Sequence, residues 1–381
     1  MSGAVPGRVA GPSVKIAALV AATVPAMRDR AAYLDRASEF PKEDITDLQR
    51  AGALWLPLPV ETPGTDTTDQ LASVLTLAGR GNLSVGRVLE AHINARHLIG
   101  RFGTQAQRQM AQRQTAQRHI AQHPAIQSGA DGEAALFALW VTDPPDDGLR
   151  MWRSGGTIRL SGGKQFCSAA GHATHAIVTA RDEDGASWML ILQVGRGERV
   201  TPLPSPLAGM RAAVTGAVDF SGYETEAASL LGEPGDYLRE PDLSAGAWRG
   251  SAVALGGLMA LVEAATEQLR KSGRLENPHT QARLGQAMIA RETAAMWVQR
   301  AANAAEDRRR PTGERIATVG LARIAVESAC LDAMQVLQRS LGLSSFQSGT
   351  DIERICRDLQ TYLRQPAPDD VLTESALWFA Q

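Results

Sequence analysis

The chain contains little cysteine. Its three cysteines, Cys167, Cys330 and Cys356, are odd in number, far apart in 381 residues and in no C-x-x-C pair. This spacing argues against a disulfide framework and against a structural zinc site. We therefore expect no bound metal and a reducing, cytoplasmic location.

The chain also lacks an excess of either charge and a long hydrophobic run. A formal net charge of −2 and a pI near 6.4 give no electrostatic footprint for nucleic acid. The apolar run over residues 14–27 is interrupted by Pro25 and falls short of the roughly 20 residues that a membrane span needs. We expect it to form the first amphipathic helix.

Several common cofactor and catalytic motifs do not occur. The sequence holds no G-x-G-x-x-G, no G-x-x-x-x-G-K-[ST] and no G-x-S-x-G segment. Dinucleotide-binding Rossmann folds, P-loop nucleotide hydrolases and α/β-hydrolases therefore have no support from motifs.

What is present is a helix–strand–helix order. A chain of 381 residues is longer than one core usually serves. We expect an N-terminal helical domain over residues 1–135, a central β-domain over 136–242 and a C-terminal helical bundle domain over 243–381. Gly273 and Gly342 are helix stops and Asn277 is a helix start, which predicts C-terminal helices at about 244–273, 278–308, 313–341 and 350–364.

Four segments resemble the acyl-CoA dehydrogenase superfamily. Trp140–Pro144 (WVTDP) is similar to its W/C-x-T-E-P segment, and Ser161–Ser168 (SGGKQFCS) to N-G-x-K-x-W-I-T/S. Phe40–Gly52 matches F-P-x-E-x-I-x-x-L-x-x-A-G, and Glu353–Asp358 (ERICRD) matches E-R-x-x-R-D. The resemblance implies an α+β fold with an N-terminal helical domain, a central β-barrel or sandwich and a C-terminal four-helix bundle.

The same resemblance implies an FAD cofactor. Thr142 and Ser168 would hydrogen-bond the flavin, with Trp140 and Phe166 against its ring. In the family, an arginine and a glutamine from a neighbouring subunit complete the FAD site, which implies a homodimer or homotetramer. The candidates for this role are Arg270, Arg274, Gln281, Gln335 and Gln338.

The catalytic base of the family has no match at either of its usual positions. The stretch after Arg357–Asp358 reads LQTYLRQPAPDD, which puts Gln365 or Pro366 where the usual glutamate stands. The second family position falls at Trp248, before Arg249. Removing a weakly acidic proton needs a positioned base. The remaining candidates for the catalytic group are Asp369, Asp370, His92 and His172.

The resemblance therefore implies an FAD-dependent oxidoreductase with a non-standard substrate. That substrate is a small molecule, with an acyl thioester as one option, and an electron-transfer partner or oxygen would reoxidise the flavin. A flavin-dependent monooxygenase of the same fold is an alternative, because Phe166–His175 (FCSAAGHATH) resembles the F-C-S-G-x-x-x-A segment of that branch. A non-catalytic flavoprotein or partner subunit is a second alternative.

Overall fold

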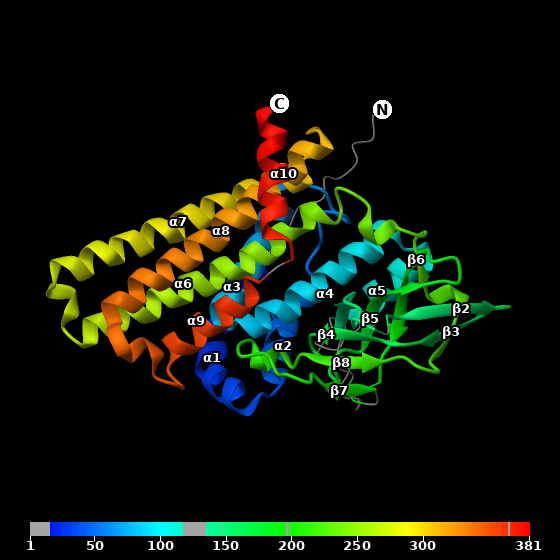
Figure 1. Ribbon diagram of the computed structural model, residues 1–381, viewed down its shortest axis with the longest axis horizontal. Coiled ribbons are helices and arrows are strands. Elements are labelled where there is room, and N and C mark those ends of the chain that lie inside the picture. The colour runs from blue at the N-terminus through cyan, green and yellow to red at the C-terminus, as the bar shows by residue number, and fades with distance from the viewer. Residues whose placement is uncertain (1–15, 117–134, 147, 196, 198, 365) are drawn as a thin grey trace, which may run out of the picture.

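A computed structural model shows how the helices and strands are arranged (Figure 1). It describes residues 16–116, 135–146, 148–195, 197, 199–364 and 366–381. Helices come first, strands occupy the middle of the chain and long helices follow, so the expected α+β order is confirmed. In Figure 1 the sheets lie at one end of the molecule and the long C-terminal helices extend from the other.

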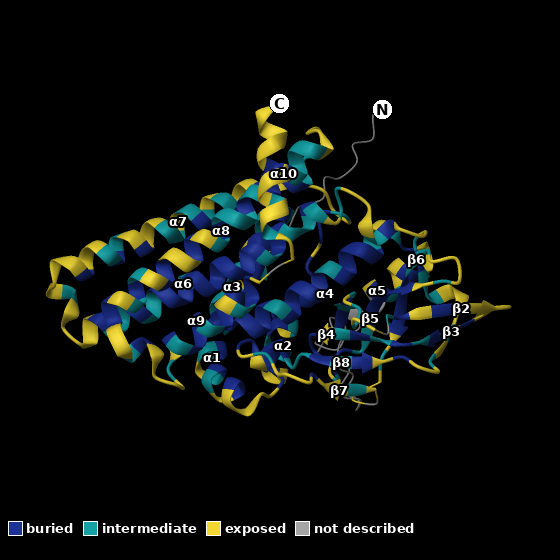
Figure 2. Ribbon diagram, viewed as in Figure 1, coloured by how far each residue is buried: buried dark blue, intermediate teal, exposed yellow. Residues whose placement is uncertain are grey.

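The N-terminal helices surround one central helix, α4. Asn82 begins this helix by accepting a hydrogen bond from the Ser84 backbone N–H at 2.9 Å, the usual way to satisfy a free helix N–H. Figure 2 shows α4 buried along most of its length, and it lies between β1 and α6. These helices are α1 (Ile16–Ala37), α2 (Lys42–Arg50), α3 (Thr65–Gly81), α4 (Leu83–Phe102) and α5 (Gln105–Ala116).

The strands form two sheets. The larger sheet has the order β10-β6-β5-β2-β3-β9, with β1 pairing in parallel with β5, and the smaller has the order β4-β8-β7. The strands are β1 (Phe137–Trp140), β2 (Arg150–Ser154), β3 (Thr157–Ser161), β4 (Gly163–Cys167), β5 (His175–Arg181), β6 (Ser187–Gln193), β7 (Val200–Pro202), β8 (Gly216–Asp219), β9 (Glu224–Glu226) and β10 (Leu230–Leu231).

The chain passes between the two sheets at Gly162 and Gly163, between β3 and β4. Gly162 has φ of +89°, a left-handed conformation that a side chain disfavours. A Cβ atom on Gly163 would lie 2.7 Å from the Val218 carbonyl oxygen of the neighbouring strand. Both glycines are therefore required at this crossing, which moves β4 away from β3.

The C-terminal helices follow the predicted ones closely, with one addition. Asn277 begins α7 as expected, since its side chain accepts hydrogen bonds from two backbone N–H groups. A further helix, α10, was not predicted; it begins at Pro368, and proline suits a first helical turn. The helices are α6 (Trp248–Lys271), α7 (Pro278–Glu306), α8 (Thr312–Leu341), α9 (Asp351–Tyr362) and α10 (Pro368–Ala380).

The N-terminal and C-terminal helices share one hydrophobic core. Leu75 of α3, Leu89 of α4, Leu258 of α6 and Val326 of α8 belong to it, whereas the strands have a separate core. One segment, Ser244–Lys271, is long and apolar enough to cross a membrane, but 78% of its most apolar stretch is buried inside the protein. Its composition is therefore explained by its place in this core.

Candidate active site

A cavity of about 450 Å³ lies where α4, β1, α6, α8 and α9 meet. Leu139 and Val141 form its wall on the β1 side, and Val326 lines it from the bundle. Its volume falls within the range of small-molecule sites, which are mostly apolar with a few converging polar groups.

The polar groups of the cavity converge on Glu90 of α4. Its Oε2 accepts hydrogen bonds from Arg87 Nη1 and from the Tyr362 hydroxyl, both at 2.9 Å, and its Oε1 accepts from Asn94 Nδ2 at 3.1 Å. Burial, followed by the negative charge of Glu90, raises the pKa of Tyr362 well above its usual value, so the phenol keeps its proton and donates. The arrangement holds one carboxylate at a fixed place in the cavity.

Arg249, at the start of α6, is the other charged group that the cavity buries. Its side chain is 5% exposed, and its Nε donates to Asn94 Oδ1 at 2.6 Å. Burial lowers the pKa of this guanidinium. Arg249 and Glu90 therefore share Asn94 as a common neighbour without forming an ion pair with each other.

The two strand-end segments predicted to hold a cofactor lie together. The Gln165 backbone N–H donates to the Thr142 carbonyl oxygen at 2.9 Å, and Trp140 Nε1 donates to the Ser168 carbonyl oxygen at 2.9 Å. Phe166 is 48% exposed with φ of +54°, whereas Trp140 is only 2% exposed within the core of the strands. Trp140 therefore positions Ser168, and Phe166 is the aromatic ring that faces outward.

Lys164 holds the segment that follows β1 in place. Its Nζ lies 2.5 Å from Asp143 Oδ1, 3.0 Å from Thr179 Oγ1 and 3.3 Å from the Val141 carbonyl oxygen. Burial lowers the pKa of this ammonium group, while Asp143 opposes the shift. These partners lie in β5 or just after β1, so the role of Lys164 is structural.

The two candidate histidines occupy different surroundings. The Phe137 backbone N–H donates to His92 Nδ1 at 3.0 Å, so Nε2 carries the proton and donates to the Leu54 carbonyl oxygen at 2.8 Å. Burial and the neighbouring Arg96 lower the pKa of His92 to about 3, which keeps it neutral. His172 stacks on Phe40, with ring centroids 4.2 Å apart. Neither histidine lines the cavity.

The two candidate aspartates lie on the unpredicted helix. Asp369 and Asp370 are exposed in the first turn of α10, which packs on α8, and they do not line the cavity. Pro366 does line it, and its carbonyl oxygen accepts from Arg323 Nη2 at 2.7 Å. Gln365 lies outside the described residues.

Comparison with known proteins identifies this architecture. Residues 16–118 match a family model described as the acyl-CoA dehydrogenase N-terminal domain. The structure of butyryl-CoA dehydrogenase from Megasphaera elsdenii matches with a TM-score of 0.80 and 16% identity, over 99% of this chain and 100% of that chain. The protein has the acyl-CoA dehydrogenase fold. The resemblance drawn from the sequence segments is confirmed.

Other solved structures that match this fold include one with bound FMN. TdsC from Paenibacillus sp. A11-2, solved with FMN and indole, matches with a TM-score of 0.81 and 17% identity over 96% of both chains. Nitrososynthase from Micromonospora carbonacea var. africana matches with a TM-score of 0.76 and 21% identity, over 97% of this chain and 98% of that chain. No curated protein sequence matches the chain. At these identities the likeness establishes the fold alone.

The strand-end residues fit a flavin. In the described part of the chain, the Thr142 and Ser168 side-chain hydroxyls form no hydrogen bond, although Ser168 is 7% exposed. Thr142 is exposed, and Ser168 lies two residues from the outward Phe166, so both hydroxyls are available to a polar, aromatic ligand.

The residues predicted to complete a neighbour's FAD site gather at one end of this acyl-CoA dehydrogenase fold. Figure 1 shows the α6–α7 connection at the end of the bundle away from the sheets. There Arg274 donates to the Ser340 and Leu341 carbonyl oxygens, at 3.3 and 2.8 Å, and Gln281 donates to the Leu275 carbonyl oxygen. The other three candidates belong to the nearby helix segments: Arg270, which pairs with Glu267, and Gln335 and Gln338 on α8.

The arginine–aspartate pair of the family segment joins three parts of the fold. Arg357 forms two hydrogen bonds to Asp35 of α1, at 2.7 and 3.1 Å, and a third to the Ala208 carbonyl oxygen at 2.6 Å. Asp358 accepts the Met210 backbone N–H at 2.6 Å. The pair fixes the loop before β8 against α1 and α9, and its role is structural.

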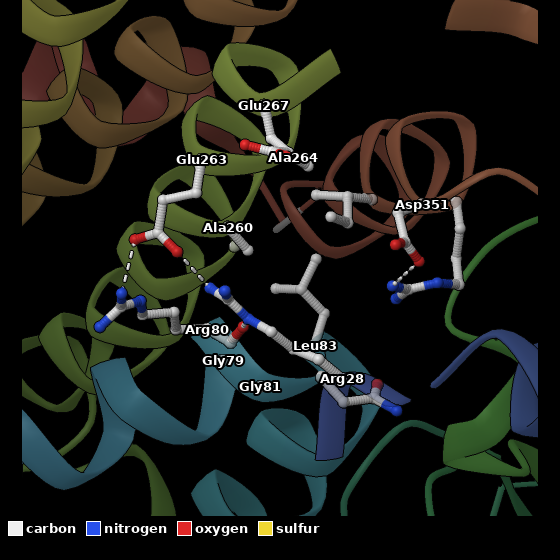
Figure 3. A pocket seen from close by; sticks show the side chains of 14 residues that line it. Arg28, Gly79, Arg80, Gly81, Leu83, Ala260, Glu263, Ala264, Glu267 and Asp351 are labelled. Atoms are coloured by element: carbon white, nitrogen blue, oxygen red, sulfur yellow. Dashed lines mark hydrogen bonds and ion pairs between the residues drawn. The ribbon is translucent and has the colours of Figure 1, made fainter. Parts of the chain in front are cut away.

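A second pocket, of about 350 Å³, lies between α3, α6 and α9 (Figure 3). Glu263 pairs with Arg28 at 2.5 Å and with Arg80 at 2.8 Å, and Asp351 pairs with Arg354 at 3.1 Å. Every arginine of this pocket therefore has a carboxylate partner, and the cluster ties the helices together.

Sequence reasoning missed three residues of the cavity. Glu90, Asn94 and Tyr362 lie in helices and carry no recognisable motif, and Glu90 and Tyr362 are 272 positions apart. The one available signal was a glutamate, Glu90, within a long and largely apolar helical segment. The described residues contain no cluster of three or more potential metal ligands.

Proposed function

We propose that the protein is an FAD-dependent oxidoreductase that acts on a small molecule held in the cavity between α4, β1, α6 and α9. The observation that carries this proposal is the pair of hydroxyls, Thr142 and Ser168, that form no hydrogen bond within the described chain; Thr142 directly follows Val141, which lines that cavity. A bound flavin supplies two-electron redox chemistry, which side chains alone lack.

In this proposal the chain's own residues have separate tasks. The Thr142 and Ser168 hydroxyls bind the flavin and Phe166 covers it, while Trp140 and Lys164 hold the strand ends in place. Glu90 Oε1 receives the proton that leaves the substrate, because the family's two carboxylate positions hold no carboxylate here. Ionic hydrogen bonds orient such a base before the reaction.

Subunit assembly is part of the proposal. The five residues expected to complete the FAD site lie at the far end of the bundle from Thr142 and Ser168 (Figure 1). A second copy would bring that end to the strand-end site, so we propose a homodimer or homotetramer. A cytoplasmic location is proposed with it, since Cys167, Cys330 and Cys356 are all free and buried.

Flavin uptake tests the proposal. We expect the purified protein to show flavin absorbance, or to take up added FAD in a calorimetric titration. Thr142→Val together with Ser168→Ala should weaken FAD binding about 5- to 100-fold, because each lost hydrogen bond contributes roughly 0.5–1.5 kcal/mol.

A matched double variant is the control. Ser154→Ala with Thr157→Val makes the same two changes at an exposed pair on β2 and β3, and it should leave FAD affinity unchanged. Protein without flavin absorbance that also takes up no FAD or FMN would refute the proposal. Equal weakening in both double variants would remove the roles assigned to Thr142 and Ser168.

A flavin-dependent monooxygenase is the second candidate. It is favoured by the lack of a carboxylate at the two positions where a dehydrogenase of this fold holds its base. Anaerobic reduction of the flavin followed by mixing with oxygen separates the two, since only the monooxygenase gives a transient oxygen adduct in the absorption spectrum.

A further inference from the structure

Three carboxylates and three arginines line the cavity, but most of them do not pair with one another. Each of its three carboxylates already has an arginine partner. The pairs are Glu90 with Arg87 at 2.9 Å, Asp242 with Arg101 at 3.1 Å and Glu327 with Arg364 at 2.5 Å. Two further arginines, Arg249 and Arg323, line the same space. Among the described residues, Arg249 and Arg323 therefore form no direct ion pair with the carboxylates of the cavity.

Arg249 is the more deeply buried of the two. No carboxylate of the described residues lies within 4.0 Å of its guanidinium, and its one hydrogen bond is the one that Nε donates to Asn94. Its Nη1 and Nη2 groups form no hydrogen bond within the described chain, while the side chain as a whole is 5% exposed. Four N–H donors of this guanidinium therefore have no partner within the described chain.

The surrounding backbone leaves room for this guanidinium. Gly246, one turn before Arg249, is a position where a Cβ atom would lie 2.6 Å from Arg249 Nη2. Arg249 also lines an adjoining pocket of about 220 Å³, so its head group faces two open spaces. Glycine at this position keeps the Nη2 side accessible.

Burying an unpaired charge is unfavourable by several kcal/mol in real proteins. Elsewhere in this chain even partly exposed arginines are paired, as Arg28 and Arg80 are with Glu263 (Figure 3). Arg323 shows the same deficit as Arg249, because its buried Nε has no partner and its Nη2 donates only to the Pro366 carbonyl oxygen. An anion in the cavity would supply the missing partner.

We propose that the cavity binds a small organic acid whose carboxylate lies against Nη1 and Nη2 of Arg249. The planar fork of a guanidinium matches a carboxylate in two parallel hydrogen bonds, and the apolar walls at Leu139 and Val326 accommodate the rest of the molecule. This inference deepens the proposed function. It rests on that function in one respect only, namely that the acid is the substrate of the flavin reaction.

Calorimetric titration with matched acids and amides tests this. The probes are acetate, benzoate and phenylacetate, each compared with its neutral amide, and phenylphosphonate as a phosphoryl anion. We expect at least one carboxylate to bind 10-fold or more tightly than its amide, since a hydrogen bond to a charged group contributes that much in affinity. If no carboxylate exceeds its amide by 3-fold, the inference is overturned. Tighter binding of phenylphosphonate than of every carboxylate overturns the choice of a carboxylate.

Variants connect the preference to Arg249. Arg249→Gln should abolish the preference for acid over amide, Arg249→Lys should retain part of it, and the exposed Arg159→Gln should leave it intact. Gly246→Ala keeps the charge but places a methyl group against Nη2, so it should weaken acid binding even if Arg249→Gln does not fold. A preference that survives in both Arg249→Gln and Gly246→Ala refutes the assignment.

Two further measurements separate this inference from neighbouring explanations. Without ligand, Arg249→Gln should melt at the same or a higher temperature than wild type, because it removes an unpaired buried charge; a large loss of stability would mean a structural role. Flavin content is recorded in each sample. Flavin-loaded protein without acid preference overturns the inference alone, whereas protein that takes up no flavin defeats the proposed function and leaves the acid–amide comparison measured.

Discussion

Replacing Trp140 by phenylalanine should damage both stability and flavin binding. The change removes the indole N–H that donates to the Ser168 carbonyl oxygen at 2.9 Å, where Trp140 is 2% and Ser168 7% exposed. A buried carbonyl left without its donor costs about 1–3 kcal/mol, and the smaller ring adds about 1 kcal/mol by leaving space in a packed core. We expect the free energy of unfolding to fall by about 2–4 kcal/mol.

Trp188→Phe is the matched control. Trp188 Nε1 donates to Asp182 Oδ2 at a similar distance, 2.8 Å, but Asp182 is partly exposed and water can replace the lost donor. This variant should lose no more than about 1 kcal/mol.

Urea unfolding measures the free energy, and FAD titration of each variant measures uptake. We expect Trp140→Phe to weaken FAD binding because the Ser168 segment is no longer fixed, and Trp188→Phe to leave it unchanged. Equal free energies of unfolding for the two variants, within about 0.5 kcal/mol, would show that the Trp140–Ser168 hydrogen bond does not hold this strand end.

Two further predictions concern charge and chemistry. Burial raises the pKa of Asp358 to about 6 from an ordinary 3.8, so the native state keeps this proton to higher pH than the unfolded chain does. Its contribution to stability therefore falls as pH rises from about 4 to about 6, by on the order of 3 kcal/mol. Asp358→Asn should lack this fall, and a wild-type-minus-variant difference that stays constant across urea titrations at pH 4 and 6.5 would contradict the reasoning. Butyryl-CoA should not bleach the oxidised flavin at a useful rate in stopped flow. Neither family position holds the carboxylate that removes the α-proton of an acyl-CoA, Glu90 lies elsewhere in the cavity, and a base out of position forfeits roughly 10²–10⁴ in rate. Bleaching that disappears in Glu90→Gln or in Asp369→Asn would restore the dehydrogenase assignment and identify its base.

The order of elements and the proximity of the two family-like strand-end segments could be predicted from the sequence. Helix starts such as Asn277 and strand alternation such as Thr157–Ser161 act over a few residues, and the structure has them where the pattern predicts. The two family-like segments also come together as expected, since Gln165 bonds Thr142 and Trp140 bonds Ser168. Local backbone preference and the period of apolar residues are short-range properties, and they are enough to predict where helices and strands form.

Some expectations depended on how the fold orients a segment. Asp369 and Asp370 were candidates because they follow the family position by a few residues, but the chain there forms α10 and packs on α8. Trp140 lies in the core of the strands, and its place against a flavin ring stays a prediction. Sequence position gives the distance along the chain, whereas the direction in which a side chain faces depends on the sheet into which its strand is built.

The polar chemistry of the cavity is decided by tertiary structure alone. Glu90 on α4 meets Tyr362 on α9 across 272 positions, and no periodicity connects them. Whether an arginine forms an ion pair depends on which carboxylate the packed helices bring within about 4 Å. Arg28 and Arg249 therefore look alike in sequence, but in the fold Arg28 pairs with Glu263 and Arg249 bonds only Asn94. The sequence determined the helices and strands. The packing of α4, α6 and α9 left Arg249 buried without an ion-pair partner. Whether two charges pair depends on the distance between them, and only the folded chain sets that distance.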